Sequence, residues 1–343
     1  MQAVFHYFSA TGNTARAVEL LAARLQAAGW EVVRQPVTAR TVAVTAVPDL
    51  TVLAFPIWAW AAPHFMLEHA RRLPRAKGAR AAVFATCGGF GAQGVGELAR
   101  VLRRRGYAVV ASGEAAYPDN WTLALNPPAG PELDAALARG DARVREFADR
   151  LLSAQPAVFR CAWGHVLWSW PIARLFRLCG RRFMGKFFIA DDRCTACGRC
   201  AAECPARAIR LEGVPARPRW NAGCAGCYRC INLCPVQAIQ VSGPRLAIHL
   251  LLNLALTVWW FFWIDWLYRQ VVPLPGPSGF GLAVIWAVAI LAVLTMLQLT
   301  LGDAVLQWLA TRAPLRRFFQ RSYTQAFRRY RAPGFRPGEK GNP

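Results

Sequence analysis

Two hydrophobic patterns alternate along the first 153 residues: short continuous runs and longer segments with helical spacing. Residues 2–8 form a short and nearly continuous hydrophobic run, which predicts a strand buried on both faces of a sheet. From about residue 13 to residue 28, the hydrophobic positions recur with helical spacing. Further runs predict strands at about 50–55, 81–85 and 107–111 and helices at about 63–72, 95–105 and 131–152. Strands that alternate with helices indicate a doubly wound parallel α/β sheet, whose ligands bind at the carboxyl ends of the strands.

Two longer apolar stretches lie near the C-terminus, at about 247–268 and 279–301. The second contains no charged residue, and each is long enough to cross a bilayer core, which takes about 20 helical residues. We therefore predict a two-helix transmembrane hairpin over residues 247–301. Arginines crowd residues 302–343, whereas the connector 269–278 has a single basic residue. Because basic flanking segments stay in the cytoplasm, both ends of the hairpin should face the cytoplasm.

The chain is strongly basic, with 41 lysines and arginines against 19 acidic residues and a net charge of +22. Nucleic acid or anionic lipid would suit such a surface. No nucleic-acid-binding motif is present and 55% of the residues are hydrophobic, so we expect membrane lipid as a partner and no nucleic acid. Residues 154–188 mix tryptophans with arginines in apolar runs too short to span, which indicates a helix on the membrane surface. An ordinary linker packed between domains is the alternative.

Eight of the eleven cysteines form two copies of the run C-x2-C-x2-C-x3-C-P, at 194–205 and 224–235. This is the bacterial ferredoxin spacing for [4Fe–4S] clusters, in which the fourth cysteine serves the other cluster. The ligands would be Cys194, Cys197, Cys200 and Cys234 for one cluster and Cys224, Cys227, Cys230 and Cys204 for the other. An apolar run follows each copy, at 208–211 and 238–241, and predicts matching strands. We therefore expect a two-cluster α+β domain at 189–243 rather than four-cysteine zinc sites.

A loop rich in hydroxyl groups, Ser9 to Thr14, joins the first predicted strand to the first predicted helix. Backbone N–H groups and the dipole at such a helix start attract a phosphate. The hydroxyls of Ser9, Thr11 and Thr14 can add further donors. Because the loop has no lysine, it is not the loop of a nucleotide triphosphatase, and we expect a monophosphate ester.

Two later loops at predicted strand ends carry aromatic residues and glycines. The loop 56–60 contains Trp58 and Trp60, whose faces suit a flat ring. The loop 86–91 supplies Cys87, Gly88, Gly89 and Phe90. Its glycines also match the dinucleotide pattern G-x-G-x-x-G. That pattern belongs to the first strand–helix turn, whereas this loop follows the fourth strand, so NAD(P) binding here is only an alternative.

These loops resemble those of flavodoxins. Together with the two cysteine runs, residues 1–243 resemble the family of flavodoxin–ferredoxin fusion proteins, the EFR-type ferredoxins. The segments 86–89 and 118–121 are similar to motifs of that family, whereas the membrane hairpin lies outside the resemblance. The resemblance implies FMN as cofactor. It implies phosphate contacts from Ser9, Thr11, Gly12, Asn13 and Thr14, ring contacts from Trp58 or Trp60 and from Phe90, and a place for Cys87, Gly88 and Gly89 beside the flavin.

A flavin exchanges electrons in pairs or singly, while each cluster takes one electron at a time. We therefore expect a membrane-anchored protein that passes electrons between FMN and two [4Fe–4S] clusters. Its partners would be a soluble donor (ferredoxin, flavodoxin or an NAD(P)H reductase) and a membrane-bound acceptor or quinone. An NAD(P)H- or ferredoxin-dependent reductase of quinone or another lipid-phase substrate is an alternative, and an iron–sulfur redox sensor is another. No catalytic residue is predicted.

The expected organisation places the redox domains in the cytoplasm and the hairpin in the cytoplasmic membrane. The N-terminus shows no secretory signal, which agrees with this location. The expected segments are an FMN domain at 1–153, an interfacial linker at 154–188, the two-cluster domain at 189–243, the hairpin at 247–301 and a basic cytoplasmic tail at 302–343.

Overall fold

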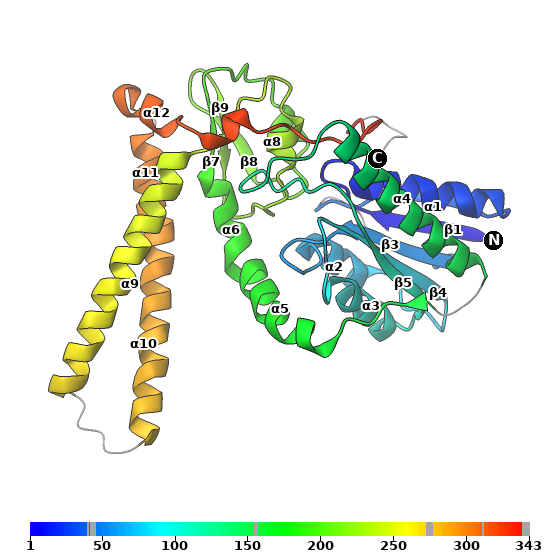
Figure 1. The fold of residues 1–343 in the computed structure, drawn as a ribbon, viewed down its shortest axis with the longest axis horizontal. Helices are drawn as coiled ribbons and strands as arrows, with labels where there is room; N and C mark the ends of the chain where they lie inside the picture. Colours follow the sequence, from blue (N-terminus) through cyan, green and yellow to red (C-terminus); the bar gives the residue numbers. More distant parts are fainter. Residues whose placement is uncertain (40, 42–45, 154–156, 272–276, 311, 338–343) are drawn as a thin grey trace. The chain divides into compact units, whose positions relative to one another are not determined.

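The computed structural model describes residues 1–343 except 40, 42–45, 154–156, 272–276, 311 and 338–343 (Figure 1). The chain forms two compact units. The first comprises Met1–Gly185, Asp192–Ile239 and Ala326–Pro343, and the second comprises Lys186–Asp191 and Gln240–Gln325. The predicted cytoplasmic tail at 302–343 is therefore divided between the two units.

A parallel sheet with the strand order β2-β1-β3-β4-β5-β6 organises the first unit. Its strands are β1 (Gln2–Tyr7), β2 (Glu31–Pro36), β3 (Leu50–Pro56), β4 (Arg80–Cys87), β5 (Ala108–Ala116) and β6 (Ala157–Val158). The order of the first five strands is that of the flavodoxin-like doubly wound fold. The predicted fold class is confirmed. Strand β2 lacks a separate sequence prediction because it lies at the sheet edge and mixes polar with apolar residues.

Helices cover both faces of this sheet (Figure 1). Helices α1 (Asn13–Ala27) and α4 (Pro131–Leu152) pack on one face, and α2 (His64–Arg72) and α3 (Gly94–Arg104) pack on the other. Successive side chains of β4 point to opposite faces, so Phe84 joins the core with α1 while Val83 joins the core with α2. Burial on both faces explains the continuous hydrophobic runs of the inner strands.

A helical segment follows the sheet, as the pattern over 159–188 predicted. It comprises α5 (Trp163–Leu175), the π-helical η1 (Phe176–Gly180), α6 (Arg181–Met184) and the 3-10 turn η2 (Gly185–Phe187). One side of the segment packs on the start of α3: Ser169 donates to Gln93 Oε1 at 2.5 Å, and Arg177 pairs with Glu97 at 2.6 Å. The other side is apolar and exposed, with Trp163 84% and Leu167 71% accessible.

The two cysteine runs have equivalent backbone conformations, as an internal duplication requires. Positive φ angles occur at matched positions, Ala196 with Gly226, Gly198 with Tyr228, and Arg207 with Gln237. A short helix follows in each copy, α7 (Arg199–Ala202) and α8 (Arg229–Leu233). The predicted strands appear as β8 (Ile209–Glu212) and β10 (Ile239–Val241). Strand β8 pairs antiparallel with β9 (Arg217–Trp220), and β10 pairs with β7 (Phe188–Ala190).

The second unit is built around two long helices, α9 (Gly243–Val271) and α10 (Pro277–Leu297). The second helix continues through the π-helical η3 (Gln298–Gly302) into α11 (Asp303–Leu309), and α12 (Ala313–Phe319) follows. The segments Gly243–Ile264 and Trp286–Leu309 are long and apolar enough to cross a membrane. A buried polar group joins them, because Asp303 accepts from Arg245 at 2.5 Å and lies 3.4 Å from His249 Nε2.

The C-terminal tail returns to the first unit after the 3-10 turn η4 (Tyr323–Ala326). Tyr330, Ala332 and Phe335 are buried in the same core as α1 and α4. Arg328 donates to Asn126 Oδ1 and to the carbonyl oxygen of Pro127, at 2.9 Å and 2.8 Å. Residues 326–337 are therefore part of the packed structure, although their arginines suggested a solvated tail.

Candidate functional site

A cavity of about 680 Å³ opens at the carboxyl ends of β1, β3, β4 and β5. This volume lies within the range of pockets that hold small molecules or cofactors. The loops after all four strands line the cavity, as the doubly wound topology predicts. Ten of the eleven predicted cofactor residues line it: Ser9, Thr11, Asn13, Thr14, Trp58, Trp60, Cys87, Gly88, Gly89 and Phe90. The eleventh, Gly12, does not line the cavity but shapes the loop.

The loop from Ser9 to Thr14 forms one end of this cavity. Its turn depends on Gly12, which has a φ of 111° and whose N–H donates to Ser9 Oγ at 3.1 Å. A Cβ atom on Gly12 would lie 2.7 Å from Ala332 and from Phe335, so neither the φ nor the space admits a larger residue. Helix α1 begins directly afterwards without a side-chain cap. Uncapped N–H groups at a helix start can bind a phosphate.

Polar side chains of this loop hold neighbouring elements in place. Thr14 and Thr86 share a hydroxyl hydrogen bond of 2.7 Å, which joins α1 to the end of β4. Asn13 Nδ2 donates to the carbonyl oxygen of Pro118 at 2.8 Å, and Asn120 Nδ2 donates to Thr11 Oγ1 at 3.0 Å. The side chains of Thr11, Asn13 and Thr14 thus also fix the loop itself.

The two motifs that resemble the fusion family lie against each other. A Cβ atom on Gly88 would come within 2.2 Å of a carboxylate oxygen of Asp119. Asp119 in turn accepts from the N–H of Trp121 at 2.7 Å. Glycine at position 88 therefore lets the loop after β5 close over the loop after β4. The sequence could show the two motifs but not this contact.

Aromatic side chains surround the other end of the cavity. Trp58 packs edge-on against Phe8, with ring centroids 5.7 Å apart. Trp60 packs against Trp168 of α5 at 4.8 Å, and Phe90 packs against His165 at 4.7 Å. Trp168 itself lines the cavity, so the predicted interfacial linker supplies part of the cavity wall. Sequence reasoning assigned Trp168 to the membrane surface because its neighbours are tryptophans and arginines.

Cys87 lies in the cavity wall as a buried, protonated thiol. Burial and the nearby carboxylate of Glu114 raise the pKa of Cys87 to about 12. Burial also raises the pKa of Glu114, whose Oε1 accepts from the N–H of Gly91 at 3.2 Å. At neutral pH, Cys87 is therefore neither a nucleophile nor a ready metal ligand.

The second cysteine run contributes to the wall of the same cavity as the loop from Ser9 to Thr14. Gly226 and Tyr228 line the cavity. Trp121 Nε1 donates to the Tyr228 hydroxyl at 3.0 Å, and Tyr228 donates to the sulfur of Met184 at 3.4 Å. Phe176 and Met184 also line the cavity. The cysteine motif predicted a cluster here but gave no sign of contact with the cavity.

Burial affects the thiols of both cysteine runs. Burial raises the pKa of Cys200 to about 11, with further contributions from Cys194, Cys234 and Cys197. Burial likewise raises the pKa of Cys227 to about 12, with contributions from Cys204 and Cys224. Among the described residues, no His, Cys, Asp or Glu side chains converge as closely as a single metal ion requires, and the cluster ligands stay a prediction.

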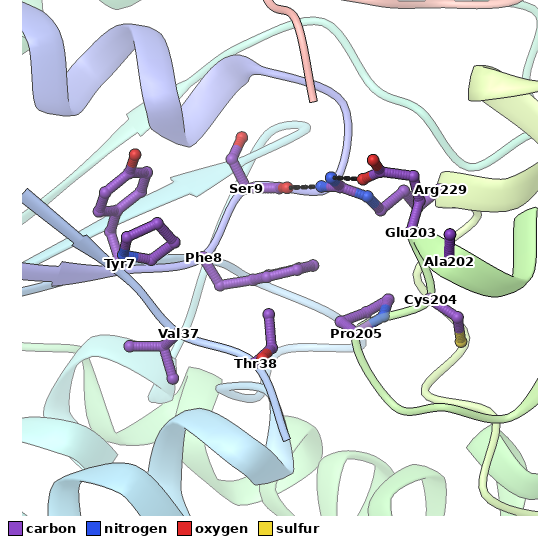
Figure 2. A pocket seen from close by; sticks show the side chains of 11 residues that line it. Tyr7, Phe8, Ser9, Val37, Thr38, Ala202, Glu203, Cys204, Pro205 and Arg229 are labelled. Carbon is purple, nitrogen blue, oxygen red and sulfur yellow. Dashed lines mark hydrogen bonds and ion pairs between the residues drawn. The ribbon is translucent and has the colours of Figure 1, made fainter. Parts of the chain in front are cut away.

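Arg229 is the first residue of α8 and lies between Cys227 and Cys230 in the second run. Its side chain connects the loop from Ser9 to Thr14 with the cysteine runs (Figure 2). Its guanidinium donates to the carbonyl oxygen of Ser9 and to Glu203 Oε2, both at 2.6 Å. A smaller cavity of about 200 Å³ lies beside this bridge and is lined by Cys204. Because Arg229 is mostly buried and its charge is paired, it fixes the phosphate loop against the cluster domain.

The C-terminal tail contains residues of the site that sequence reasoning missed. The N–H of Ala332 donates to the carbonyl oxygen of Thr11 at 2.8 Å. The Tyr330 hydroxyl donates to Asn13 Oδ1, and Phe335 lies 5.6 Å from the Arg229 guanidinium. The N–H of Tyr330 also donates to Asn232 Oδ1 on α8 at 2.9 Å. The only sequence signal was the presence of three apolar side chains among arginines.

Comparison with known proteins agrees with this organisation. Residues 187–241 match a family model described as a 4Fe-4S dicluster domain. The comparison with curated proteins gave no match. Among solved structures, a Streptococcus pneumonia TIGR4 flavodoxin is 19% identical, with a TM-score of 0.34 over 45% of this chain and 99% of its own. Flavodoxin 2 from Bacillus cereus is also 19% identical, with a TM-score of 0.31 over 44% and 99%.

A third solved structure is the rubredoxin oxygen:oxidoreductase of Desulfovibrio gigas, 14% identical, with a TM-score of 0.31 over 45% of this chain and 36% of its own. At these scores the fold is established by the strand order. The flavodoxin-like sheet and the dicluster domain place the chain in the class of electron-transfer proteins that join an iron–sulfur module to a flavodoxin-like domain.

Proposed function

We propose that this protein is a flavodoxin–ferredoxin fusion that carries FMN and two [4Fe–4S] clusters and passes electrons between a soluble donor and a membrane-bound acceptor. The observation that carries the proposal is the shared wall of the 680 Å³ cavity, which joins the phosphate loop to the second cysteine run. A flavin bound there would lie beside a cluster. FMN would supply the exchange between paired and single electrons.

The cavity residues fit FMN by chemical type. The glycine turn and the uncapped start of α1 can hold its phosphate, and Trp58, Trp60 and Phe90 can flank its ring. The predicted cluster ligands are Cys194, Cys197, Cys200 and Cys234 for one cluster and Cys224, Cys227, Cys230 and Cys204 for the other. Cys224 and Cys227 of the second run are buried, and burial is one of the properties that tune a cluster's potential.

The two long helices of the second unit support the proposal of a membrane anchor. Only 11% of the first apolar segment and 6% of the second is buried within the protein. Helices of this composition in the core of a water-soluble protein would be mostly buried by other side chains. Because these helices are not, we propose that lipid surrounds their apolar side chains. Phe261, Phe262 and Trp286 are each more than 60% exposed. We propose that both helices cross the cytoplasmic membrane and that the redox domains lie on the cytoplasmic side.

An anaerobic titration of the detergent-purified protein tests this function. We expect the iron of two [4Fe–4S] clusters and one FMN per chain, and joint bleaching of flavin and cluster absorbance by reduced ferredoxin or dithionite. Absence of flavin from protein with intact clusters would contradict the proposal. Rapid bleaching by NADH or NADPH would instead favour the second candidate, an NAD(P)H-dependent reductase with a lipid-phase substrate.

A further inference from the structure

We propose that the first cysteine run is the port at which a separate, acidic electron-transfer protein exchanges electrons. The second run then lies between this port and the flavin cavity. This inference rests on the proposed function, and it adds the order of the carriers and the chemistry of the soluble partner.

The second run is enclosed by the flavodoxin-like domain. Ala225 and Cys227 are 2% and 9% exposed and belong to the same core as Phe8 and Phe65. Gly226 lines the flavin cavity between them. A cluster held by this run would therefore be close to the flavin and shielded from any external protein.

Hydrogen bonds hold this run against the loops of the cavity. Arg229 donates to the carbonyl oxygen of Ser9 at 2.6 Å. Asn232 Nδ2 donates to Thr122 Oγ1 at 3.1 Å, and Trp121 donates to the Tyr228 hydroxyl at 3.0 Å. These bonds come from three positions of the second run and reach two different loops of the sheet. The inner carrier is thus fixed relative to the cavity.

The first run lies at the surface of the same unit. Cys197 is exposed and Cys194 and Cys200 are half-buried, whereas in the second run Cys224 and Cys227 are buried and Cys230 is half-buried. In the part of the chain that the structure describes, residues 193–201 line neither the flavin cavity nor the smaller one. Electrons that arrive from another protein would meet this run first.

The surface around the port is basic. Residues 192–220 contain six arginines and three acidic residues. Arg193 is exposed beside Cys194, and Arg199 is half-buried beside Cys200. Of the nearby acids, Asp191 is buried, Asp192 is paired with Arg217 at 3.3 Å, Glu203 is paired with Arg229 at 2.6 Å, and Glu212 is exposed. Positive charge at an electron-transfer surface favours rapid encounter with a negatively charged partner.

The proposed step is a single electron transfer. One electron leaves the reduced partner for the cluster of the first run, no bond forms or breaks, and the oxidised partner dissociates. The reverse direction uses the same surface. The proposed partner, a negatively charged protein that transfers one electron at a time, is a small acidic two-cluster ferredoxin.

Charge reversal tests the port in the full-length protein in detergent. The double variant Arg193→Glu and Arg199→Glu removes the positive charge beside the first run. The control is the double variant Arg139→Glu and Arg145→Glu on the exposed side of α4. It makes the same change in net charge at positions distant in sequence from the first cysteine run. Dissociation constants are measured with an oxidised acidic two-cluster ferredoxin, and electron-transfer rates with the reduced one, at several salt concentrations. Cluster absorbance reports whether each variant carries its clusters.

We expect the port variant to bind the ferredoxin at least tenfold more weakly at low salt and to lose most of its salt dependence. The α4 variant should change either property less than twofold. Equal effects of both variants would show that net charge alone attracts the partner, and unchanged binding by the port variant would also overturn the proposal. If dithionite reduces neither flavin nor cluster in the unmodified protein, the proposed function fails rather than the port.

Discussion

His6 and His69 form a buried pair that the proposed function does not use. They are 1% and 5% exposed, and their ring centroids lie 4.9 Å apart. Burial, and then the neighbouring His69, lowers the pKa of His6 to about 3. Burial, and then Arg72, lowers the pKa of His69 to about 4. Both rings are therefore neutral in the folded protein at physiological pH.

This pair should make the first unit sensitive to mild acid. Both pKa values are lower in the folded chain than the ordinary 6.5, so the unfolded chain binds more protons below that pH. The contribution of the two neutral rings to the free energy of unfolding is fully present above pH 6.5 and falls as the pH drops toward 4. We expect a loss of about 1 kcal/mol per histidine between pH 7.5 and pH 5.5.

Denaturant unfolding at the two pH values checks this expectation. The variant His69→Phe should lose part of the pH dependence, and the exposed control His165→Gln should retain all of it. A pH dependence that is identical in the wild type and in His69→Phe would contradict the assignment.

At the residue scale, local spacing predicted much of the site. The loop Ser9–Thr14 and the cysteine runs are contiguous in sequence, so their chemistry is visible without the fold. Contacts between distant segments were not visible in the sequence. The need for glycine at position 88 is explained by its contact with Asp119, and the burial of His6 involves its contact with His69. Nothing in the pattern around Trp168 distinguished a membrane-facing tryptophan from one that lines the cavity.

The C-terminal tail is the element whose role differs most from its composition. Its arginines predicted a solvated cytoplasmic segment, yet Tyr330, Ala332 and Phe335 are buried against the phosphate loop and α8. The segment has no helical or strand period, so hydrophobic periodicity could not detect it. The two long apolar helices, in contrast, were predicted within several residues, because about 20 consecutive apolar residues give a strong signal.

Removal of one tail side chain should loosen the phosphate loop. Phe335→Ala empties a buried site beside Gly12 and Arg229, and the expected loss in free energy of unfolding is about 3 kcal/mol. FMN affinity should fall at least tenfold, because the loop loses part of its support. Phe318→Ala is the control, since Phe318 is 41% exposed and belongs to the second unit. Equal effects of the two substitutions would contradict a specific role for the tail.

At the scale of the whole molecule, the chain leaves the first unit at Ile239 and rejoins it at Ala326. If the two apolar segments between these points each cross a membrane, both ends of the hairpin must lie on the side of the first unit. This constraint does not depend on the distribution of arginines. It agrees with the positive-inside rule, which places both ends on one side and identifies that side as the cytoplasm.

Cysteine labelling in intact spheroplasts tests the orientation. A membrane-impermeant maleimide should label Ser278→Cys, at the start of α10, from outside. It should label Tyr323→Cys, which replaces a side chain 42% exposed, only after the membrane is made permeable. Labelling of both variants, or of neither, in intact spheroplasts would show that the segments do not form a spanning hairpin.

The return of the tail also sets an order of events during synthesis. The loop from Ser9 to Thr14 leaves the ribosome before the two long apolar helices, and Ala332 and Phe335 leave it after them. Thr11 therefore gains its hydrogen bond from Ala332 only after the hairpin has been translated. A chain that stops early, or whose hairpin fails to bring the tail back, lacks the final support of its phosphate loop. Completion of this loop thus requires that translation has passed the hairpin and reached Ala332.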